Sequence, residues 1–468
     1  MKSHSQIKLL QEMIDPGDEV LTDMFIREII AVGVATEACS LAGNYIVQRL
    51  LFANDSDSRV EMVKHLIYPP SLLANGGVLP PSTYLGQSAL PISALHIHIN
   101  PAHAAAASNE PGSRNAFRAW LTEAERQLQE EAREIFAATE ELQLLHILCE
   151  KSGTRCIQVL LEPSRAFETL HMLRVIKQSA YFARPFDIHL LFSTLALVAP
   201  SGLLAISCDA IGSHVMQLIL RLGIPPLGGA PDDQLDSLQQ LLGLKRHFLK
   251  TVIGPIFCQY MSIIAGRQFG VVVVKALYDV CSSDPELLAD RERIAAAVAA
   301  DVVSLAINPH GTFIVAHILT TTDNKGDSLL LLHSIEDRGG VDSFGNKTGF
   351  LDLAMNKYAS NALEKLLQCL NPSRSEQDAQ TATFVVSKLL TSSEVYPNPV
   401  VALVNSQSGN YVLQAAASVC SIQQATFIRD QLIPGGLYHV VKSTPGGKKL
   451  FGVLEQRIAR SSLKPFPL

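Results

Sequence analysis

The chain has 468 residues, which is too long for one ordinary hydrophobic core and predicts either several domains or one elongated repeat array. Apolar residues make up 47% of it and charged residues only 18%, a composition typical of a well-packed, mostly helical protein. The formal net charge of −6 argues against a strongly basic nucleic-acid binder, although phosphate attraction depends on the local face rather than on the chain total.

The sequence contains no signature of a metal site or a targeting segment. Its eight cysteines are scattered and form no CxxC pair, and most lie in apolar helical stretches, as reduced thiols of a cytosolic protein do. His96, His98 and His103 follow metal-like spacing, but they lie in a Pro/Ala-rich stretch without acidic or cysteine companions. The N-terminus lacks the apolar run of a signal peptide. We therefore expect no metal, no cofactor and a cytoplasmic location.

One pattern recurs along the chain: a short apolar run, a few small or polar residues, a glycine or other small residue, and an apolar helix. The copies are SLAGNYIVQRLLF from Ser40, CEKSGTRCIQVLLE from Cys149, CDAIGSHVMQLIL from Cys208, AGRQFGVVVVKAL from Ala265, INPHGTFIVAHIL from Ile307, MNKYASNALEKLL from Met355, NSQSGNYVLQAAA from Asn405 and a degenerate KSTPGGKKLFGVLEQ from Lys442. The shortest spacings set the repeat at about 40 residues, which has room for two or three short helices.

The longer spacings are explained by insertions. Stretches rich in Pro, Gly and Ser predict insertion loops near residues 69–113, 222–234 and 337–349. Between the first loop and the second repeat, the sequence from Phe117 to Cys149 predicts a helix with one charged side, and a cryptic repeat near 112–150 stays open. We assign residues 1–24 to an N-terminal cap segment and 25–468 to the repeat domain.

The apolar stretch from Ile188 to Ser207 has the length of a membrane span. His189 and the Pro200-Ser201-Gly202 break divide it, so it predicts two buried helices instead. We expect a protein without a membrane-spanning segment.

The helix that opens each copy carries a pair of polar residues one turn apart. In Asn44-Tyr45-Ile46-Val47-Gln48 the first and fifth residues share one face, whereas Ile46 and Val47 turn toward the core. Asn and Gln each carry a donor and an acceptor, which suits the edge of a nucleic-acid base, and Tyr45 can stack on a base plane. Helices packed roughly 8–10 Å apart would present one such set per nucleotide of an extended strand.

GNYIVQ, GTRCIQ, GSHVMQ, ASNALEK and GNYVLQ resemble the RNA-reading helices of the Pumilio (PUF) family, and GGKKLFGVLEQ resembles its C-terminal capping helix. NKYASNALEKLL is similar over its whole length to the family's guanine-reading, next-to-last repeat. The resemblance extends from about residue 25 to the C-terminus, with insertions. It implies an all-α, crescent-shaped solenoid of Pumilio-type repeats, similar to an armadillo superhelix, that binds RNA and catalyses no reaction.

In that family the first and fifth residues of the helix contact the base edge and the second stacks on the base. The resemblance therefore implies a set of RNA-binding residues in six repeats. The set is Asn44, Tyr45 and Gln48; Thr154, Arg155 and Gln158; Ser213, His214 and Gln217; Phe313, as a stacking residue only; Ser360, Asn361 and Glu364; and Asn410, Tyr411 and Gln414.

The family's base preferences carry over to particular pairs. Asn44 with Gln48 and Asn410 with Gln414 resemble uracil readers, and Thr154 with Gln158 resembles an adenine reader. Ser360 with Glu364 resembles a guanine reader, because a carboxylate accepts from two guanine donors. The preference of Ser213 with Gln217 stays open. Since the RNA runs antiparallel to the protein chain in this family, the resemblance implies a 5′-UG element.

Two central repeats depart from the family pattern. Val271, Val272 and Lys275 replace the polar set in one, and Thr312, Phe313 and Ala316 replace it in the next. The family's first repeat is also absent. The two bases opposite the central repeats should therefore be read loosely.

Three functions remain open on this sequence. The first is sequence-selective binding of messenger RNA 3′ untranslated regions by a monomer that regulates translation or stability, with protein co-repressors on the convex face. The second is a divergent RNA-binding factor of ribosome assembly, which would be nucleolar. The third, from another class, is a solenoid that binds protein partners and has lost RNA binding.

Overall fold

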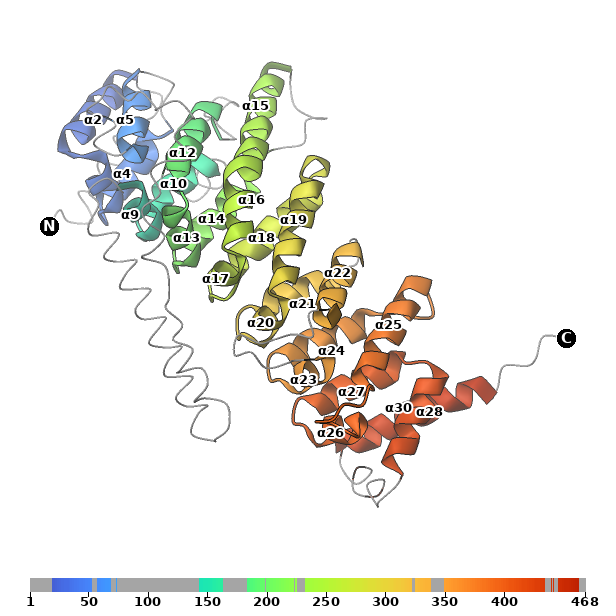
Figure 1. Cartoon of the computed structure of the whole chain (residues 1–468). Coiled ribbons are helices and arrows are strands. Elements are labelled where there is room, and N and C mark those ends of the chain that lie inside the picture. The colour runs from blue at the N-terminus through green and yellow to red at the C-terminus, as the bar shows by residue number, and fades with distance from the viewer. Residues whose placement is uncertain are drawn as a thin grey trace, which may run out of the picture. The chain divides into compact units, whose positions relative to one another are not determined.

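The computed structural model describes residues 19–52, 57–68, 143–162, 183–197, 199–222, 232–321, 325–337, 349–433 and 445–462, with single residues 73, 224, 439 and 441 (Figure 1). Every regular element within these ranges is a helix. The prediction of an all-α fold is confirmed. The predicted loop 69–113 with its three histidines, apart from residue 73, and most of the predicted helix 117–149 lie outside the described residues.

The helices form two compact units. Unit 1 comprises residues 1–257 and 272–290, and unit 2 comprises residues 258–271 and 291–468. The chain therefore enters unit 2, returns to unit 1 over residues 272–290, and then completes unit 2. The helices that lie wholly or mostly in unit 1 are α2 (Glu19–Val32), α3 (Val34–Cys39), α4 (Gly43–Leu50), α5 (Asp57–Ile67), α9 (Gln143–Cys149), α10 (Gly153–Leu161), α12 (Pro185–Leu197), α13 (Ser201–Cys208), α14 (Gly212–Arg221), α15 (Asp232–Phe248), the π-helix η6 (Leu249–Ile253), α16 (Gly254–Gln259), α18 (Gly270–Ser283) and η7 (Pro285–Leu287).

Unit 2 holds the C-terminal repeats. Its helices are α17 (Met261–Ala265), α19 (Leu288–Ala300, from residue 291), α20 (Val302–Ile307), α21 (Thr312–Thr320), α22 (Lys325–Asp337), α23 (Phe350–Met355), α24 (Ala359–Cys369), α25 (Glu376–Leu389), α26 (Pro399–Asn405), α27 (Gly409–Val419), α28 (Ile422–Leu432) and α30 (Pro445–Ser462).

Each of the first seven repeats of the sequence folds as a short first helix, a second helix and a third helix. We call the second helices α4, α10, α14, α18, α21, α24 and α27 the reader helices. In unit 1, α10 packs against both α4 and α14; in unit 2, α24 packs against both α21 and α27, and α30 packs against α27. The repeats are thus stacked through their second helices within each unit, as a helical-repeat solenoid requires.

The insertion predicted at 222–234 is too long at its C-terminal end. Helix α15 already begins at Asp232. The sequence Asp232-Asp233 favours this start, because acidic residues stabilise the positive end of the helix dipole. The Pro/Gly composition of the preceding residues hid that signal.

The stretch from Ile188 to Ser207 forms two helices, as predicted. Helix α12 ends at Leu197 and α13 begins at Ser201, with Leu195, Leu203 and Ile206 buried in the core. Among the described helices no single one is long and apolar enough to cross a membrane; α12 and α13 meet the length and composition criteria only as a pair bent by 106°.

The glycine at the start of several reader helices is required by packing. A Cβ built on Gly212 would lie 2.7 Å from the carbonyl oxygen of Ile206, in the first helix of the same repeat. The same 2.7 Å approach occurs between Gly153 and Ile147, and between Gly311 and Leu305. The first helix can cross the start of the reader helix this closely only because no side chain separates the two backbones.

We therefore expect Gly212→Ala to lower the free energy of unfolding by about 1 kcal/mol. Overpacking costs roughly 1–3 kcal/mol, and the higher helix propensity of alanine offsets roughly 0.5–1 kcal/mol of it. Gly243→Ala in α15 is the matched control, because its Cβ meets no atom within 4 Å and the substitution should stabilise the chain. Urea denaturation of both variants tests this; equal effects of the two substitutions would contradict it.

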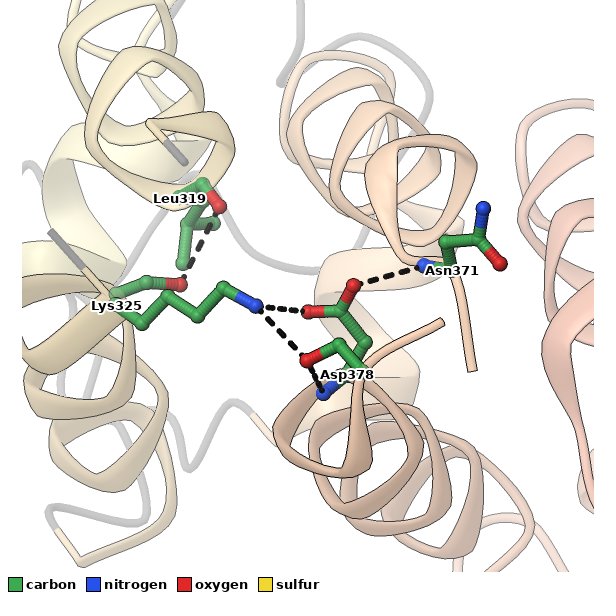
Figure 2. Close-up of polar contacts among 6 residues, drawn as sticks. Leu319, Lys325, Asn371 and Asp378 are labelled. Atoms are coloured by element: carbon green, nitrogen blue, oxygen red, sulfur yellow. Dashed lines mark hydrogen bonds and ion pairs between the residues drawn. The ribbon is translucent and has the colours of Figure 1, made fainter. Parts of the chain in front are cut away.

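Ion pairs join the third helices of neighbouring repeats in unit 2. Figure 2 shows the most extensive of these contacts: Lys325 Nζ of α22 lies 2.6 Å from Asp378 Oδ1 of α25, and it also donates to Ser375 Oγ at 3.2 Å. The other carboxylate oxygen of Asp378 accepts from the backbone N–H of Asn371 at 3.1 Å. A second ion pair joins Lys388 of α25 to Glu336 of α22.

The contacts of Asp378 predict that the free energy of unfolding falls at acidic pH. Burial by itself would raise the pKa of Asp378, but hydrogen bonds from Lys325 and the Asn371 N–H outweigh it and hold the pKa below its ordinary value of 3.8. The stabilisation is therefore complete above pH 3.8 and is lost as the pH falls through the lower folded pKa. Asp378→Asn should flatten this part of the stability–pH curve between about pH 5 and pH 2. Denaturant unfolding at several pH values checks it, and parallel curves would contradict it.

Candidate nucleic-acid interface

A polar residue three positions before the small residue fixes where most reader helices begin. Asp209 Oδ1 accepts from the N–H groups of Ile211 at 2.8 Å and Gly212 at 2.7 Å, and Asn356 Oδ1 accepts from Tyr358 at 2.8 Å and Ala359 at 3.1 Å. The equivalent residues Ser40, Glu150, Asn308 and Ser406 accept from the same backbone position in their repeats. Only the α18 repeat, among the seven reader helices, has a basic residue, Arg267, at this place.

These turns explain the phase of the repeats in physical terms. A side-chain oxygen satisfies the first free N–H groups of the helix, so the helix starts at the small residue and the next residue becomes the first reader position. A Ser, Asp, Asn or Glu three residues before a glycine is the sequence signal for the starts of α4, α10, α14, α21 and α27.

The first, second and fifth residues of the reader helices differ consistently in exposure. In α10, α14 and α24 the first residue is buried, the second is exposed and the fifth is half-buried. The third and fourth residues are buried in the core, among them Cys156 and Val215. A base lying against such a helix would meet the second side chain with its face and the fifth with its edge, as the sequence predicts.

Helix α27 carries the best-defined polar pair. Gln414 Nε2 donates to Asn410 Oδ1 at 3.3 Å, and Asn410 Nδ2 donates to the carbonyls of Ser406 and Gln407 at 2.9 Å each. The two amides therefore lie one turn apart on one face and in contact. Tyr411 beside them is 56% exposed, so its ring is free to stack.

Helix α24 presents a carboxylate at the fifth position. Glu364 is half-buried, and its Oε1 accepts from Gln368 Nε2 at 2.8 Å. Ser360 is buried at the first position, and exposed Asn361 donates to the carbonyl of Lys357 at 3.2 Å. Because α24 packs directly against α27, these two reader sets are neighbours in unit 2.

Helices α10 and α14 form a second adjacent pair, in unit 1. Arg155 and His214 are exposed at the second positions. Gln217 Nε2 donates to the carbonyl of Ser213 at 3.2 Å, which holds the amide along its helix. Gln158 is half-buried at the same position of α10.

Helix α4 differs from the other reader helices. Asn44 is 3% exposed and Gln48 6%, and Gln48 Nε2 donates to Asn44 Oδ1 at 2.9 Å. Asn44 Nδ2 in turn donates to the carbonyls of Ser40 and Leu41. The pair has the geometry of Asn410 and Gln414, but the side chains are covered in this structure, and Tyr45 is only half-exposed.

The two divergent repeats lack a polar pair, as the sequence indicated. In α18, Val271 is buried, Val272 is exposed and Lys275 is half-buried. In α21, Thr312 and Ala316 are buried and Phe313 is 51% exposed. Exposed lysines that could meet phosphates lie near the C-terminal repeats at Lys357, Lys365, Lys448 and Lys449.

The structure shows no metal centre at these helices. Among the residues that the structure describes, no group of three or more His, Cys, Asp or Glu side chains is arranged to hold an ion. Burial raises the pKa of the Cys39 and Cys420 thiols to about 11, so both stay protonated and unreactive at neutral pH.

Comparison with known proteins supports the same interpretation of the repeats. The model of the Pumilio-family RNA binding repeat matches residues 203–225 and 349–377. These stretches contain α14 with most of α13, and α23 with α24, and therefore the Ser213 and Ser360 reader sets. No curated protein matches the sequence.

Several solved structures share the fold at low sequence identity. The Puf4 RNA-binding domain, bound to the recognition sequence of the HO endonuclease RNA 3′ UTR, matches with a TM-score of 0.52 and 17% identity, covering 97% of this chain and 96% of that one. The RNA-binding domain of yeast Puf5p bound to MFA2 RNA gives a TM-score of 0.54 and 14% identity over 98% and 94%. The same domain bound to AAT2 RNA gives 0.55 and 12% over 99% and 95%.

Proposed function

We propose that this chain is a Pumilio (PUF)-type repeat protein that binds single-stranded RNA selectively, one base to each reader helix. The RNA runs antiparallel to the protein chain, so α27 meets the 5′ base and α24 the next one. The function we propose is regulation of messenger RNA translation or stability through 3′ untranslated sequences, by a monomer in the cytoplasm.

The observation that carries this proposal is the pair of adjacent helices α24 and α27. Both present a complete set of first, second and fifth residues: Ser360, Asn361, Glu364, Asn410, Tyr411 and Gln414. The amides of Asn410 and Gln414 together offer a donor and an acceptor toward a uracil edge. The carboxylate of Glu364 offers two acceptor oxygens, which suit the N1–H and N2–H₂ donors of guanine. A 5′-UG element is the ligand that this pair fits.

A second candidate is a structure-tolerant RNA binder of ribosome assembly. The absence of a polar pair in α18 and α21, and the covered pair in α4, favour it. It predicts binding that depends on RNA backbone and shape but little on base identity. The complete reader set of α24 favours the selective function instead.

Selection from a random single-stranded RNA pool, followed by sequencing, tests the proposal. Enrichment of a UG-containing motif is the expected result, with two loosely specified bases after it. Enrichment without a motif would support the structure-tolerant binder.

Salt titration of the selected RNA separates RNA binding from protein binding. Each neutralised phosphate of a single strand should contribute about −0.7 to the slope of the logarithm of the binding constant against the logarithm of the salt concentration. With four exposed lysines near the C-terminal repeats, we expect a modest negative slope. Failure to enrich any RNA, together with no salt dependence, would point to a protein partner.

A further inference from the structure

Helix α21 has no polar side chain at the fifth reader position but keeps an exposed aromatic ring at the second. The side chain of Thr312, at the first reader position, is turned to the neighbouring repeat: its Oγ1 donates to the carbonyl of Tyr358 at 3.1 Å. Tyr358 is the residue just before α24. Thr312 is buried, but so is Ser360 at the same position of α24, whose hydroxyl likewise donates to a backbone carbonyl, that of Lys357 at 3.4 Å. The first position therefore does not distinguish α21 from α24, and the difference lies at the fifth position.

At the fifth position Ala316 has no polar atom and is 8% exposed. The equivalent residues of the next two reader helices, Glu364 in α24 and Gln414 in α27, are half-buried and polar. Alanine therefore presents a methyl group where Gln or Glu presents a polar group. At the second position, in contrast to the covered Ala316, the aromatic ring of Phe313 is 51% exposed.

A nucleobase at this helix would thus bind by stacking on Phe313 and not by its edge. Stacking on an aromatic ring contributes about 1–3 kcal/mol per base and tolerates any base, and it favours purines because they cover more of the ring. Methyl groups on the Watson–Crick edge would meet the methyl group of Ala316 and no polar atom at this position. At α24, the same methyl groups would desolvate the Glu364 carboxylate and offer it no donor, which leaves only its hydrogen bond from Gln368.

We propose that the α21 repeat is a stacking-only site that accepts a purine whose Watson–Crick edge is blocked by methylation, whereas the neighbouring α24 repeat rejects one. The inference rests on the proposed function, since it assumes that the RNA strand continues from α27 and α24 onto α21. The base concerned is the third of the element, after 5′-UG.

The test uses synthetic RNA oligomers that differ at a single base. The third base is adenine, N6,N6-dimethyladenine, uracil or an abasic ribose, behind a constant 5′-UG. Dimethyladenine is uncharged and lacks the edge donors of adenine. We expect dimethyladenine and adenine to bind within about twofold of each other, and both to bind more tightly than the abasic oligomer by about 5- to 150-fold. Moving the dimethyladenine to the second base should abolish tight binding.

Two variants assign the effect to particular side chains. Phe313→Ala should remove the advantage of purine over the abasic site and leave 5′-UG selection intact. Ala316→Gln places at α21 the fifth residue of α10, α14 and α27, so it should restore a preference for adenine over dimethyladenine of tenfold or more.

The outcomes separate the two proposals. If wild-type protein selects 5′-UG but binds dimethyladenine at the third base at least tenfold more weakly than adenine, the stacking-only site is wrong and the proposed function stands. If no oligomer binds more tightly than one that lacks 5′-UG, the proposed function itself fails.

Discussion

Replacement of Arg59 by methionine is expected to lower the free energy of unfolding by about 3–5 kcal/mol, the cost of leaving one buried charge without its partner. Arg59 of α5 is 2% exposed. Its guanidinium donates to both carboxylate oxygens of Asp187 in α12, at 3.2 and 2.7 Å, and to the carbonyl of Leu51 at 3.0 Å. The contact joins the third helices of two repeats, so the variant should weaken the packing of the whole N-terminal part of unit 1.

The matched controls distinguish a buried charge from a lost contact. The double variant Arg59→Met with Asp187→Leu removes both charges and should recover most of the stability. Arg27→Met breaks the solvent-exposed ion pair with Asp23 and should change stability by less than about 1 kcal/mol. Urea denaturation followed by circular dichroism gives all three values. A cost below 1 kcal/mol for the single Arg59 variant would contradict the account of this pair.

Glu364→Gln is expected to remove the guanine preference at the second base, with a loss of about 1–3 kcal/mol for guanine and smaller changes for other bases. A carboxylate can accept from both guanine donors through its two oxygens, whereas an amide offers one oxygen and presents its own donors to the base. The measurement is the affinity for RNA oligomers that differ only at the second base.

Gln368→Ala is the control for this substitution. It removes the hydrogen bond of 2.8 Å to Glu364 but leaves the carboxylate in place, so guanine should remain preferred. If Glu364→Gln keeps the same guanine preference as the wild type, the carboxylate does not read the base.

The repeat fold follows from signals that are local in the sequence. The glycine before Thr154, Ser213 and Asn410 marks the start of each reader helix, because only a small residue can lie against the first helix. The periodic Val, Ile and Leu residues after it fill the core. Hence the phase of the helices, and the exposure of Arg155, His214, Asn361 and Tyr411, could be predicted from the sequence.

Other features depend on contacts that the sequence does not encode locally. Arg59 and Asp187 are far apart in the chain, and neither lies in a motif that predicts its partner. The burial of Asn44 and Gln48 could not be predicted from the sequence either, because the more accessible pair Asn410 and Gln414 has the same residue types. The arrangement of all reader helices along a single crescent stays a prediction.

The affinity of the wild-type protein for three RNA oligomers beginning UG, UA and UC, identical in every other base, tests the central claim most directly. Fluorescence anisotropy at one salt concentration is sufficient. The reader sets of α27 and α24 predict that the UG oligomer binds at least about tenfold more tightly than the other two. Equal binding of all three would contradict base reading by Glu364 and would favour an RNA binder that does not distinguish bases.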